Sequence, residues 1–175
     1  MNLFPQDVTA LGAEILDAAR PRALRIATAE SCTGGLVIGA LTEIPGSGDV
    51  VDRGLITYCN DAKVKLLGVD PDELALHGAV SEHTARAMAE GARDACDAQL
   101  AVAVTGVAGP SGGSAAKPVG LVWFATARAG EETVAEEKRF GDIGRAEVRM
   151  ASVRHALQML RDRLGEPLHA GSSGE

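Results

Sequence analysis

Apolar side chains recur at helical spacing in several stretches of the chain. The first stripe has its members three or four positions apart, as in an amphipathic helix that ends near residues 20–22. It is made by Val8, Leu11, Gly12, Ile15, Leu16 and Ala19. The same spacing predicts helices within residues 36–44, 81–96 and 148–159. A shorter helix, capped by Asn60 or Asp61, is expected over residues 60–69.

Strands are predicted between these helices, where short apolar runs replace the helical spacing. They lie at residues 23–30, 50–59, 98–106 and 121–127. The third run is almost wholly apolar, as strands buried in parallel sheets are, and residues 133–140 predict an antiparallel edge strand. Helices interleaved with strands, followed by a hairpin-like pair, indicate a single α/β domain. We expect three layers, α/β/α, around a mixed, mostly parallel sheet.

The connections differ in length and composition. Residues 69–80 are predicted to form a turn-rich connection. Residues 105–120, "TGVAGPSGGSAAKPVG", form a Gly/Pro/Ser loop. Loops longer than about 12 to 15 residues in a compact domain are usually functional or disordered, and we favour a functional role here. We place the domain in residues 1–164 and expect residues 165–175 to be a disordered tail.

Three of the predicted strands end in polar or glycine-rich segments. These segments are Glu30-Ser31-Cys32, Tyr58-Cys59-Asn60 and Thr105-Gly106. In α/β sheets, ligands bind at the carboxyl ends of the strands. We therefore expect the three segments to converge on one site.

Charge and composition narrow the classes of function. The formal net charge of -7 and the sequence pI of about 5.1 argue against the basic field that nucleic-acid binding usually requires. The 3 cysteines are widely spaced and form no CxxC pair, and none stands in metal-ligand spacing with His77, His83, His155 or His169. We expect no metal site. With no signal-like or membrane-spanning segment, the chain is expected to be soluble and cytoplasmic.

The stretch "AESCTGGL", residues 29–36, leaves two roles open for Ser31. Serine is favoured as a helix cap, and the same position can expose a nucleophile. The early Gly34-Gly35 pair favours the nucleophile, because the backbone N–H groups of Thr33, Gly34 and Gly35 would lie at the positive end of a helix and could stabilise an oxyanion. Cys32 is a second candidate for the nucleophile.

A serine nucleophile needs a base, and no histidine is well placed to serve. His155 in the last helix is better explained as a half-buried packing residue. A desolvated lysine is the other known type of base, which leaves Lys63 and Lys65. Two residues apart on a helix, they face different directions, and we choose Lys63 because it lies one turn from the helix start. No Walker or dinucleotide-binding pattern occurs in the glycine-rich loops.

Several motifs, in order along residues 5–164, resemble the CinA C-terminal domain family. They are "TAESCTGG", "RGLITYCNDAK", "HGAVSE", "TGVAGPSGGSAAKPVG" with "VWFA", and "FGD" followed by Arg145. The characterised activity of that family is nicotinamide mononucleotide deamidase. In many members a larger molybdopterin-binding-like domain precedes this one, so the chain resembles a stand-alone form.

The resemblance implies a Ser/Lys amidohydrolase without a cofactor. It implies Ser31 as nucleophile, Lys63 as general base and Tyr58 as an aid to proton transfer. Thr105 and Arg145 match positions implied to bind substrate, although the spacing in "FGDIGRAEVR" leaves Arg149 as an alternative to Arg145. The loop containing Gly109, Gly112 and Gly113 is a candidate cradle for a phosphate or ribose.

The expected partners are a small-molecule substrate, nicotinamide mononucleotide, and further copies of the chain, with a dimer favoured. No nucleic acid or membrane partner is expected. The alternative is a non-catalytic interaction module associated with competence or the response to DNA damage. Release of ammonia from the mononucleotide would distinguish the two.

Overall fold

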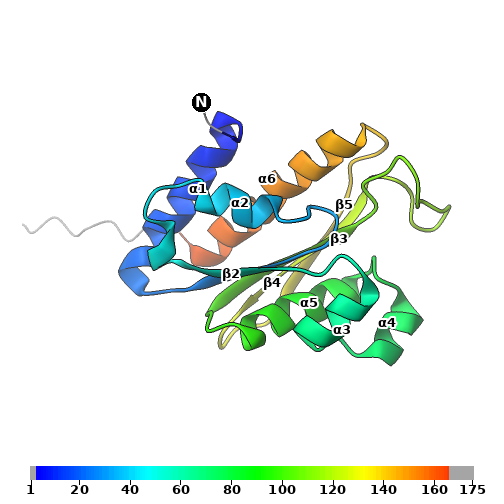
Figure 1. Cartoon of the computed structure of the whole chain (residues 1–175), viewed down its shortest axis with the longest axis horizontal. Coiled ribbons are helices and arrows are strands. Elements are labelled where there is room, and N and C mark those ends of the chain that lie inside the picture. The colour runs from blue at the N-terminus through cyan, green and yellow to red at the C-terminus, as the bar shows by residue number, and fades with distance from the viewer. Residues whose placement is uncertain (1–2, 166–175) are drawn as a thin grey trace, which may run out of the picture.

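A five-stranded sheet with helices on both faces forms the core of the computed structural model, which describes residues 3–165 (Figure 1). The strands are β1 (Ile26–Glu30), β2 (Val51–Ile56), β3 (Leu100–Gly106), β4 (Leu121–Arg128) and β5 (Val134–Arg139). The helices are α1 (Gln6–Ala19), α2 (Leu36–Thr42), α3 (Asn60–Leu67), α4 (Pro71–His77), α5 (Glu82–Ala95) and α6 (Arg145–Leu164), with short 3-10 turns at Arg20–Arg22 and Ser47–Asp49.

The sheet has the strand order β2-β1-β3-β4-β5 and is mixed, as predicted. β1 pairs in parallel with β2 and β3, whereas β4 pairs antiparallel with both β3 and β5. Parallel pairing is therefore confined to the half of the sheet that carries the three polar strand ends. The predicted edge strand is β5, antiparallel to its neighbour.

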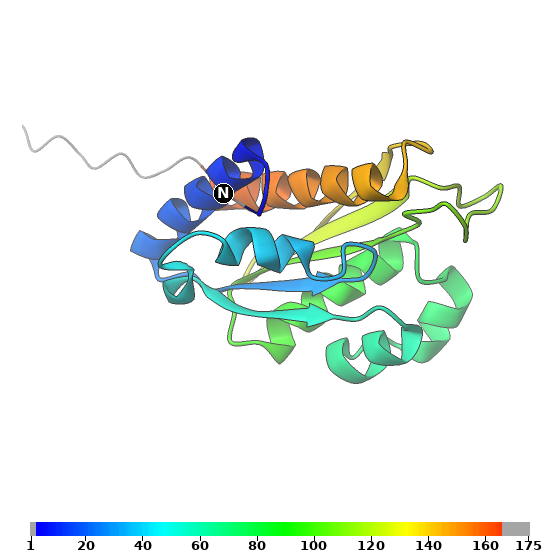
Figure 2. The same cartoon turned by 45° about the horizontal axis from the view of Figure 1, so that its top comes forward.

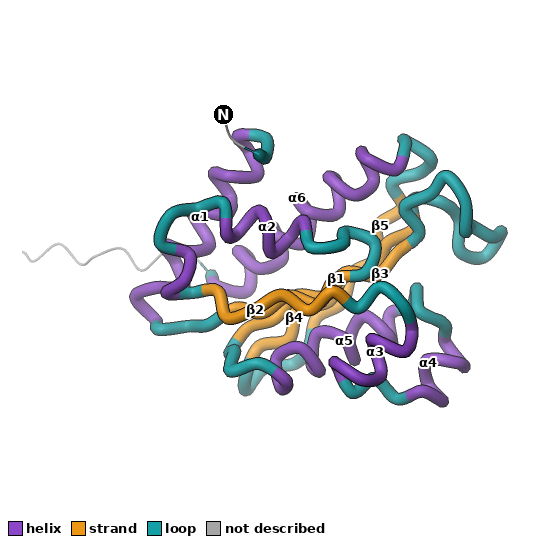
Figure 3. Tube along the Cα trace, in the orientation of Figure 1, coloured by secondary structure: helices purple, strands orange, loops and turns teal. Residues whose placement is uncertain are grey.

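The three layers follow from strict alternation of side chains along the buried strands. α1, α2 and α6 cover one face of the sheet, and α3, α4 and α5 lie on the other (Figures 2 and 3). In β3, Val102 and Val104 point into the first core, while Ala101 and Ala103 point into the second. The alanine-lined face leaves room for α5 to pack close to the sheet.

Two local predictions are wrong. The connection 69–80 contains the helix α4, whose N-cap Asp70 accepts hydrogen bonds from the amides of Asp72 and Glu73. The cap of α3 is Cys59, without a side-chain capping bond, and Asn60 is already helical. Both differences involve short helices that bury few apolar side chains, so the apolar pattern carries little signal for them.

The predicted boundary between the domain and the tail lies at the end of the described residues. α6 ends at Leu164, and the predicted tail, apart from Gly165, lies outside the described residues. Within residues 3–165, none of the helices combines the length and the apolar character that crossing a bilayer requires.

Candidate active site

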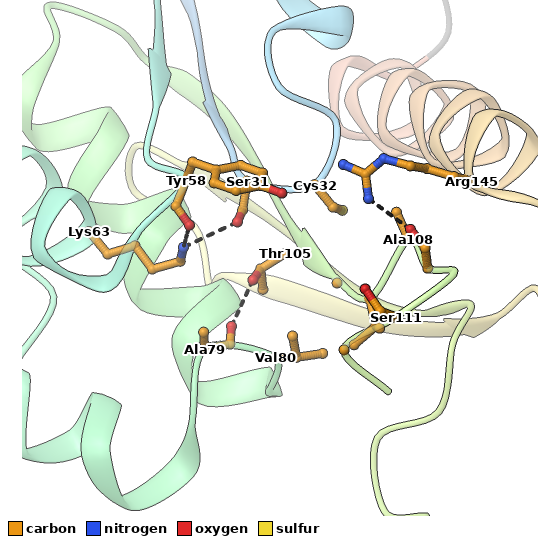
Figure 4. A pocket seen from close by; sticks show the side chains of 14 residues that line it. Ser31, Cys32, Tyr58, Lys63, Ala79, Val80, Thr105, Ala108, Ser111 and Arg145 are labelled. Carbon is orange, nitrogen blue, oxygen red and sulfur yellow. Dashed lines mark hydrogen bonds between the residues drawn. The ribbon is translucent and has the colours of Figure 1, made fainter. Parts of the chain in front are cut away.

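The carboxyl ends of β1, β2 and β3 converge on one pocket of about 300 Å³, as expected from the three polar strand ends (Figure 4). Its lining residues are Ser31, Cys32, Tyr58, Lys63, Ala79, Val80, Thr105, Gly106, Val107, Ala108, Gly109, Ser111, Gly112 and Arg145. The volume is at the lower end of the roughly 300–1,000 Å³ that small-molecule sites span. The pocket thus has the size of a site for one small ligand.

Glu30, the last residue of β1, caps the helix that follows it. Its carboxylate is fully buried and accepts hydrogen bonds from the amides of Gly35, Val37 and Ile38 and from the Thr28 hydroxyl. In the first turn of α2, the carboxylate thereby satisfies the amides of Val37 and Ile38, while the amide of Leu36 donates to Thr33 O. No side-chain hydroxyl caps α2, so Ser31 is not its cap.

Lys63 reaches back from the first turn of α3 to the end of β1. Its Nζ lies 3.2 Å from Ser31 Oγ and donates to the carbonyl oxygens of Thr57 at 2.7 Å and Tyr58 at 3.4 Å. The residue is only 1% exposed. Burial lowers the pKa of Lys63 below its ordinary value, because the charged form loses its hydration.

Lys65, the alternative base, faces away from the pocket. Its side chain is 71% exposed and its Nζ lies 2.9 Å from a carboxylate oxygen of Asp61. Lys63, in contrast, forms no ion pair with any of the described residues. The two lysines therefore divide as the helical phase predicts, one into the pocket and one into solvent.

Cys32 also lines the pocket, but its thiol is a poor candidate for the nucleophile. Burial raises the pKa of Cys32 to about 11, with a smaller contribution from the negative charge of Glu30. The thiolate is the reactive form of cysteine. Near neutral pH the side chain of Cys32 is therefore protonated, which leaves Ser31 as the better placed nucleophile.

The structure of the turn after β1 does not support the predicted oxyanion donors, the amides of Thr33, Gly34 and Gly35. The amide of Gly34 donates to Ser31 O at 3.1 Å, and that of Gly35 donates to Glu30 Oε2 at 3.0 Å. Neither glycine lines the pocket, nor does Thr33, which is fully buried. Among the backbone hydrogen bonds of the described chain, none is donated by the amide of Cys32, the residue directly after Ser31.

Arg145 lies at the opposite end of the pocket from Ser31 and Lys63 (Figure 4). Its guanidinium donates to Gly109 O at 2.8 Å, which ties the start of α6 to the glycine-rich loop. Arg149 does not line the pocket and donates instead to the carbonyls of Cys32 and Thr33, at 3.0 and 3.1 Å. Arg145 is thus the arginine that can meet a ligand, while Arg149 holds the turn after β1.

The long loop supplies part of the predicted cradle. Gly109 and Gly112 line the pocket, and Gly113 does not. Gly109 has a φ of +77°, and a Cβ there would come within 2.5 Å of a methyl carbon of Val119, so glycine is required at this point of the wall.

Thr105 lies between the two ends of the pocket, and Tyr58 lies at the end formed by Ser31 and Lys63 (Figure 4). The Thr105 hydroxyl donates to Ala79 O at 2.7 Å, which fastens the segment before α5 to the end of β3. The Tyr58 residue is 64% exposed, and its side chain lies on the Ser31 side of the pocket (Figure 4).

Several residues of the site were missed as such by the sequence analysis: Glu30 as a cap, Ala79 and Val80 as a wall, Ser111, and Arg149 as a support for the turn. A carboxylate at the end of the apolar run "IATAE" was the one signal for Glu30, because a buried charge needs partners.

The positions of the histidines agree only in part with the expectations from the sequence. His155 is half-buried, packs edge-on against Phe124 and has Nε2 at 3.0 Å from Glu136 Oε2, as expected of a packing residue. The sequence spacing indicates no cluster of His77 and His83, but in the structure their rings stack beside Glu73. Helix α4, absent from the prediction, brings them together. None of these three histidines lines the pocket.

Known proteins share both the sequence and the fold. The profile of the CinA C-terminal domain matches residues 8–164. A CinA-like protein of Myxococcus xanthus is 45% identical over 164 residues, which make up 93% of this chain and 38% of that protein. A CinA-like protein of Anaeromyxobacter dehalogenans is 52% identical over 141 residues, or 80% of this chain and 34% of that protein. The chain thus spans little more than a third of these relatives.

Two solved structures match nearly end to end. The competence/damage inducible protein CihA from Agrobacterium tumefaciens has 54% identity and a TM-score of 0.92, covering 95% of this chain and 100% of that one. The competence damage-inducible protein A from Klebsiella pneumoniae has 37% identity and a TM-score of 0.85, covering 90% and 96%. By sequence and by fold, the chain belongs to the CinA C-terminal domain family.

Proposed function

We propose that the chain is an amidohydrolase that converts nicotinamide mononucleotide to nicotinate mononucleotide and ammonia through a Ser31 acyl-enzyme. The observation that carries the proposal is the 3.2 Å approach of Lys63 Nζ to Ser31 Oγ inside a pocket. The activity itself comes from the family resemblance. The relatives are named CinA-like or competence/damage-inducible proteins, and these names state no reaction.

The partners of Lys63 support its role as a base. The carbonyl oxygens of Thr57 and Tyr58 can only accept, so they take two N–H groups of the amine. In the neutral amine the remaining position is a lone pair, and the remaining neighbour is Ser31 Oγ. The Ser31 hydroxyl then donates to Lys63, which is the hydrogen bond that precedes proton transfer.

The reaction follows as two transfers of an acyl group. Ser31 Oγ attacks the carboxamide carbon while its proton passes to Lys63 Nζ, and the carbonyl oxygen becomes an oxyanion. The C–N bond then breaks as Lys63 returns the proton to the leaving nitrogen, which departs as ammonia. Water, deprotonated by Lys63, attacks the ester and releases the carboxylate and Ser31.

The amide of Cys32 is the best placed oxyanion donor of the turn. The residue lines the pocket and directly follows the nucleophile, the position that supplies one such donor in other serine hydrolases. A preorganised donor of this kind contributes roughly 2.7–4 kcal/mol to the stability of the transition state. The exposed Tyr58 hydroxyl can assist proton exchange with solvent.

The two ends of the pocket suit the two ends of the substrate. The carboxamide would lie at Ser31 and Lys63, and the phosphate at Arg145 and the loop amides near Gly109 and Gly112 (Figure 4). Thr105 lies between them and can contact the sugar. Among the described residues, Arg145 is the only arginine that lines the pocket.

The test is release of ammonia from nicotinamide mononucleotide by the purified chain, in EDTA, with nicotinate mononucleotide identified as product. The Ser/Lys chemistry needs no metal, so turnover is expected in the chelator. A folded, inactive chain would favour the non-catalytic interaction module. Turnover that survives in Ser31→Ala would refute the Ser/Lys mechanism.

A further inference from the structure

We propose that Glu73, His77 and His83 form a binding site for a transition-metal ion, zinc above all, on the outer wall of the pocket. Glu73 and His77 stand four residues apart on α4 and so share one face of that helix. His83 is the second residue of α5, and the connection between the helices brings it beside them. The site does not depend on the proposed amidohydrolase activity.

Two of the three distances between the ligand atoms are close to those around a tetrahedral ion. Glu73 Oε2 lies 3.2 Å from His77 Nε2 and 3.4 Å from His83 Nε2, and the three ligand atoms all lie within 4.8 Å of one another. Zinc bonds of about 2.0–2.2 Å at tetrahedral angles place ligand atoms roughly 3.3–3.6 Å apart. Small side-chain movements would therefore admit an ion between the three groups.

The donor set has the chemistry of a zinc site. Two imidazole nitrogens and one carboxylate oxygen are the ligands of known His2Glu zinc centres, in which water or another ligand takes the fourth position. Imidazole selects zinc, copper or nickel over magnesium and calcium, which prefer oxygen ligands. The three side chains are 41%, 45% and 44% exposed for His77, His83 and Glu73, so an ion can reach them from solvent.

An ion at this position would stabilise one wall of the pocket. Residues 78–81 connect α4 to α5, and Ala79 and Val80 of this connection line the pocket. Hydrogen bonds already fasten this region: Lys117 Nζ donates to His77 O at 2.7 Å and Thr105 Oγ1 to Ala79 O at 2.7 Å. Thr84 Oγ1 and Ser81 Oγ donate to Gly78 O at 2.7 and 3.0 Å. An ion held by His77 and His83 would close the connection at both ends and fix that wall.

The experiment is a calorimetric titration of the full, tag-free chain with Zn²⁺ after removal of bound metal, with Co²⁺ absorption as a second probe. One ion per chain is expected. Glu73→Gln, His77→Ala and His83→Ala should each weaken binding at least about tenfold, because even the loss of a group behind a ligand costs 10–100-fold. Asp72→Asn removes an exposed carboxylate of the same helix outside the trio and should leave the affinity unchanged.

Two further measurements test the proposed metal site. Zn²⁺ should raise the melting temperature of the parent chain and leave that of His83→Ala unchanged, since only the folded parent holds the site. Bound Co²⁺ should give the visible bands of a tetrahedral ion. Equal affinity in the parent and all three variants would overturn the proposal and point to another ligand such as the exposed Cys59 thiol. Weak binding of several ions without a defined stoichiometry would overturn it as well.

Discussion

The carboxylate of Glu30 caps α2, and the hydroxyl of its neighbour Ser31 faces Lys63. Glu30 Oε2 accepts from the amides of Gly35 and Val37 at 3.0 Å each, while Ser31 Oγ lies 3.2 Å from Lys63 Nζ. The amides at the start of α2 thus donate to an acceptor inside the protein. A serine at the start of a helix is usually its cap, and here that role is filled by the preceding residue.

Ser31→Ala is expected to abolish ammonia release and to leave the free energy of unfolding within about 1 kcal/mol of the parent, since no cap is lost. Ser111→Ala, at another serine of the pocket wall, should keep most of the turnover. Both quantities are measured by the ammonia assay and by urea unfolding. An alanine variant that is less stable but fully active would show that Ser31 serves the fold alone.

Lys63→Met is expected to lose turnover, whereas Lys65→Met should remain active, because Lys63 contacts Ser31 and Lys65 pairs with Asp61 in solvent. Since the neutral amine is the base, kcat/KM of the parent should rise with pH as Lys63 loses its proton and then level off. Burial lowers the pKa of Lys63, so kcat/KM should rise at a pH below that at which a free lysine titrates. A pH-independent rate limited by chemistry would contradict the assignment.

The same burial predicts how stability depends on pH. The folded chain holds Lys63 neutral at pH values where the unfolded chain still protonates it, so the unfolded state binds more protons. The stability of the parent relative to Lys63→Met should therefore increase from the folded pKa up to the ordinary lysine value, and stay level above it. Urea unfolding of both chains across this pH range measures the difference. A relative stability that falls over the range would refute the lowered pKa.

Glu30→Gln is expected to destabilise the chain by about 1–3 kcal/mol and to reduce kcat. Both carboxylate oxygens accept hydrogen bonds, so an amide nitrogen in place of either one would face N–H or O–H donors and leave them unsatisfied. Glu14→Gln, an exposed carboxylate on α1, is the matched control and should change neither quantity. Wild-type stability in Glu30→Gln would mean that the cap does not need the charge.

The layers of the fold and the centre of the site could be predicted from the sequence because both depend on regular periods. Short apolar runs between the helical stripes indicated the strands, and their polar ends marked the edge where Ser31, Tyr58 and Thr105 meet. The phase of a single helical turn was enough to separate Lys63 from Lys65.

The remaining features depend on tertiary contacts that leave no periodic pattern in the sequence. α4 buries only Leu74, so its sequence shows no apolar stripe, and its start is marked only by Asp70 and Pro71. Without that helix, His77 and His83 could not be placed together. The hydrogen-bond partners of the Gly34 and Gly35 amides could not be predicted either, because only the folded turn brings these amides to Ser31 O and the Glu30 carboxylate.

Arg145→Ala should narrow the preference for nicotinamide mononucleotide over the riboside, mainly by impairing the phosphorylated substrate. A chain with a net charge of -7 repels anions at long range, so affinity for a phosphate must come from short contacts. Arg145 lines the pocket and donates to Gly109 O, which aims its guanidinium at the loop. Hydrogen bonds to charged groups contribute about 1.5–3 kcal/mol, or roughly ten- to more than a hundredfold in kcat/KM.

Arg149→Ala is the matched comparison, because Arg149 holds the carbonyls of Cys32 and Thr33 and does not line the pocket. Its loss should impair both substrates by the same factor and lower the melting temperature. The riboside and the mononucleotide are therefore compared in the parent and both variants. Equal kcat/KM for the two substrates in the parent would rule out a phosphate-binding end of the pocket, and a selective effect of Arg149→Ala would exchange the roles of the two arginines.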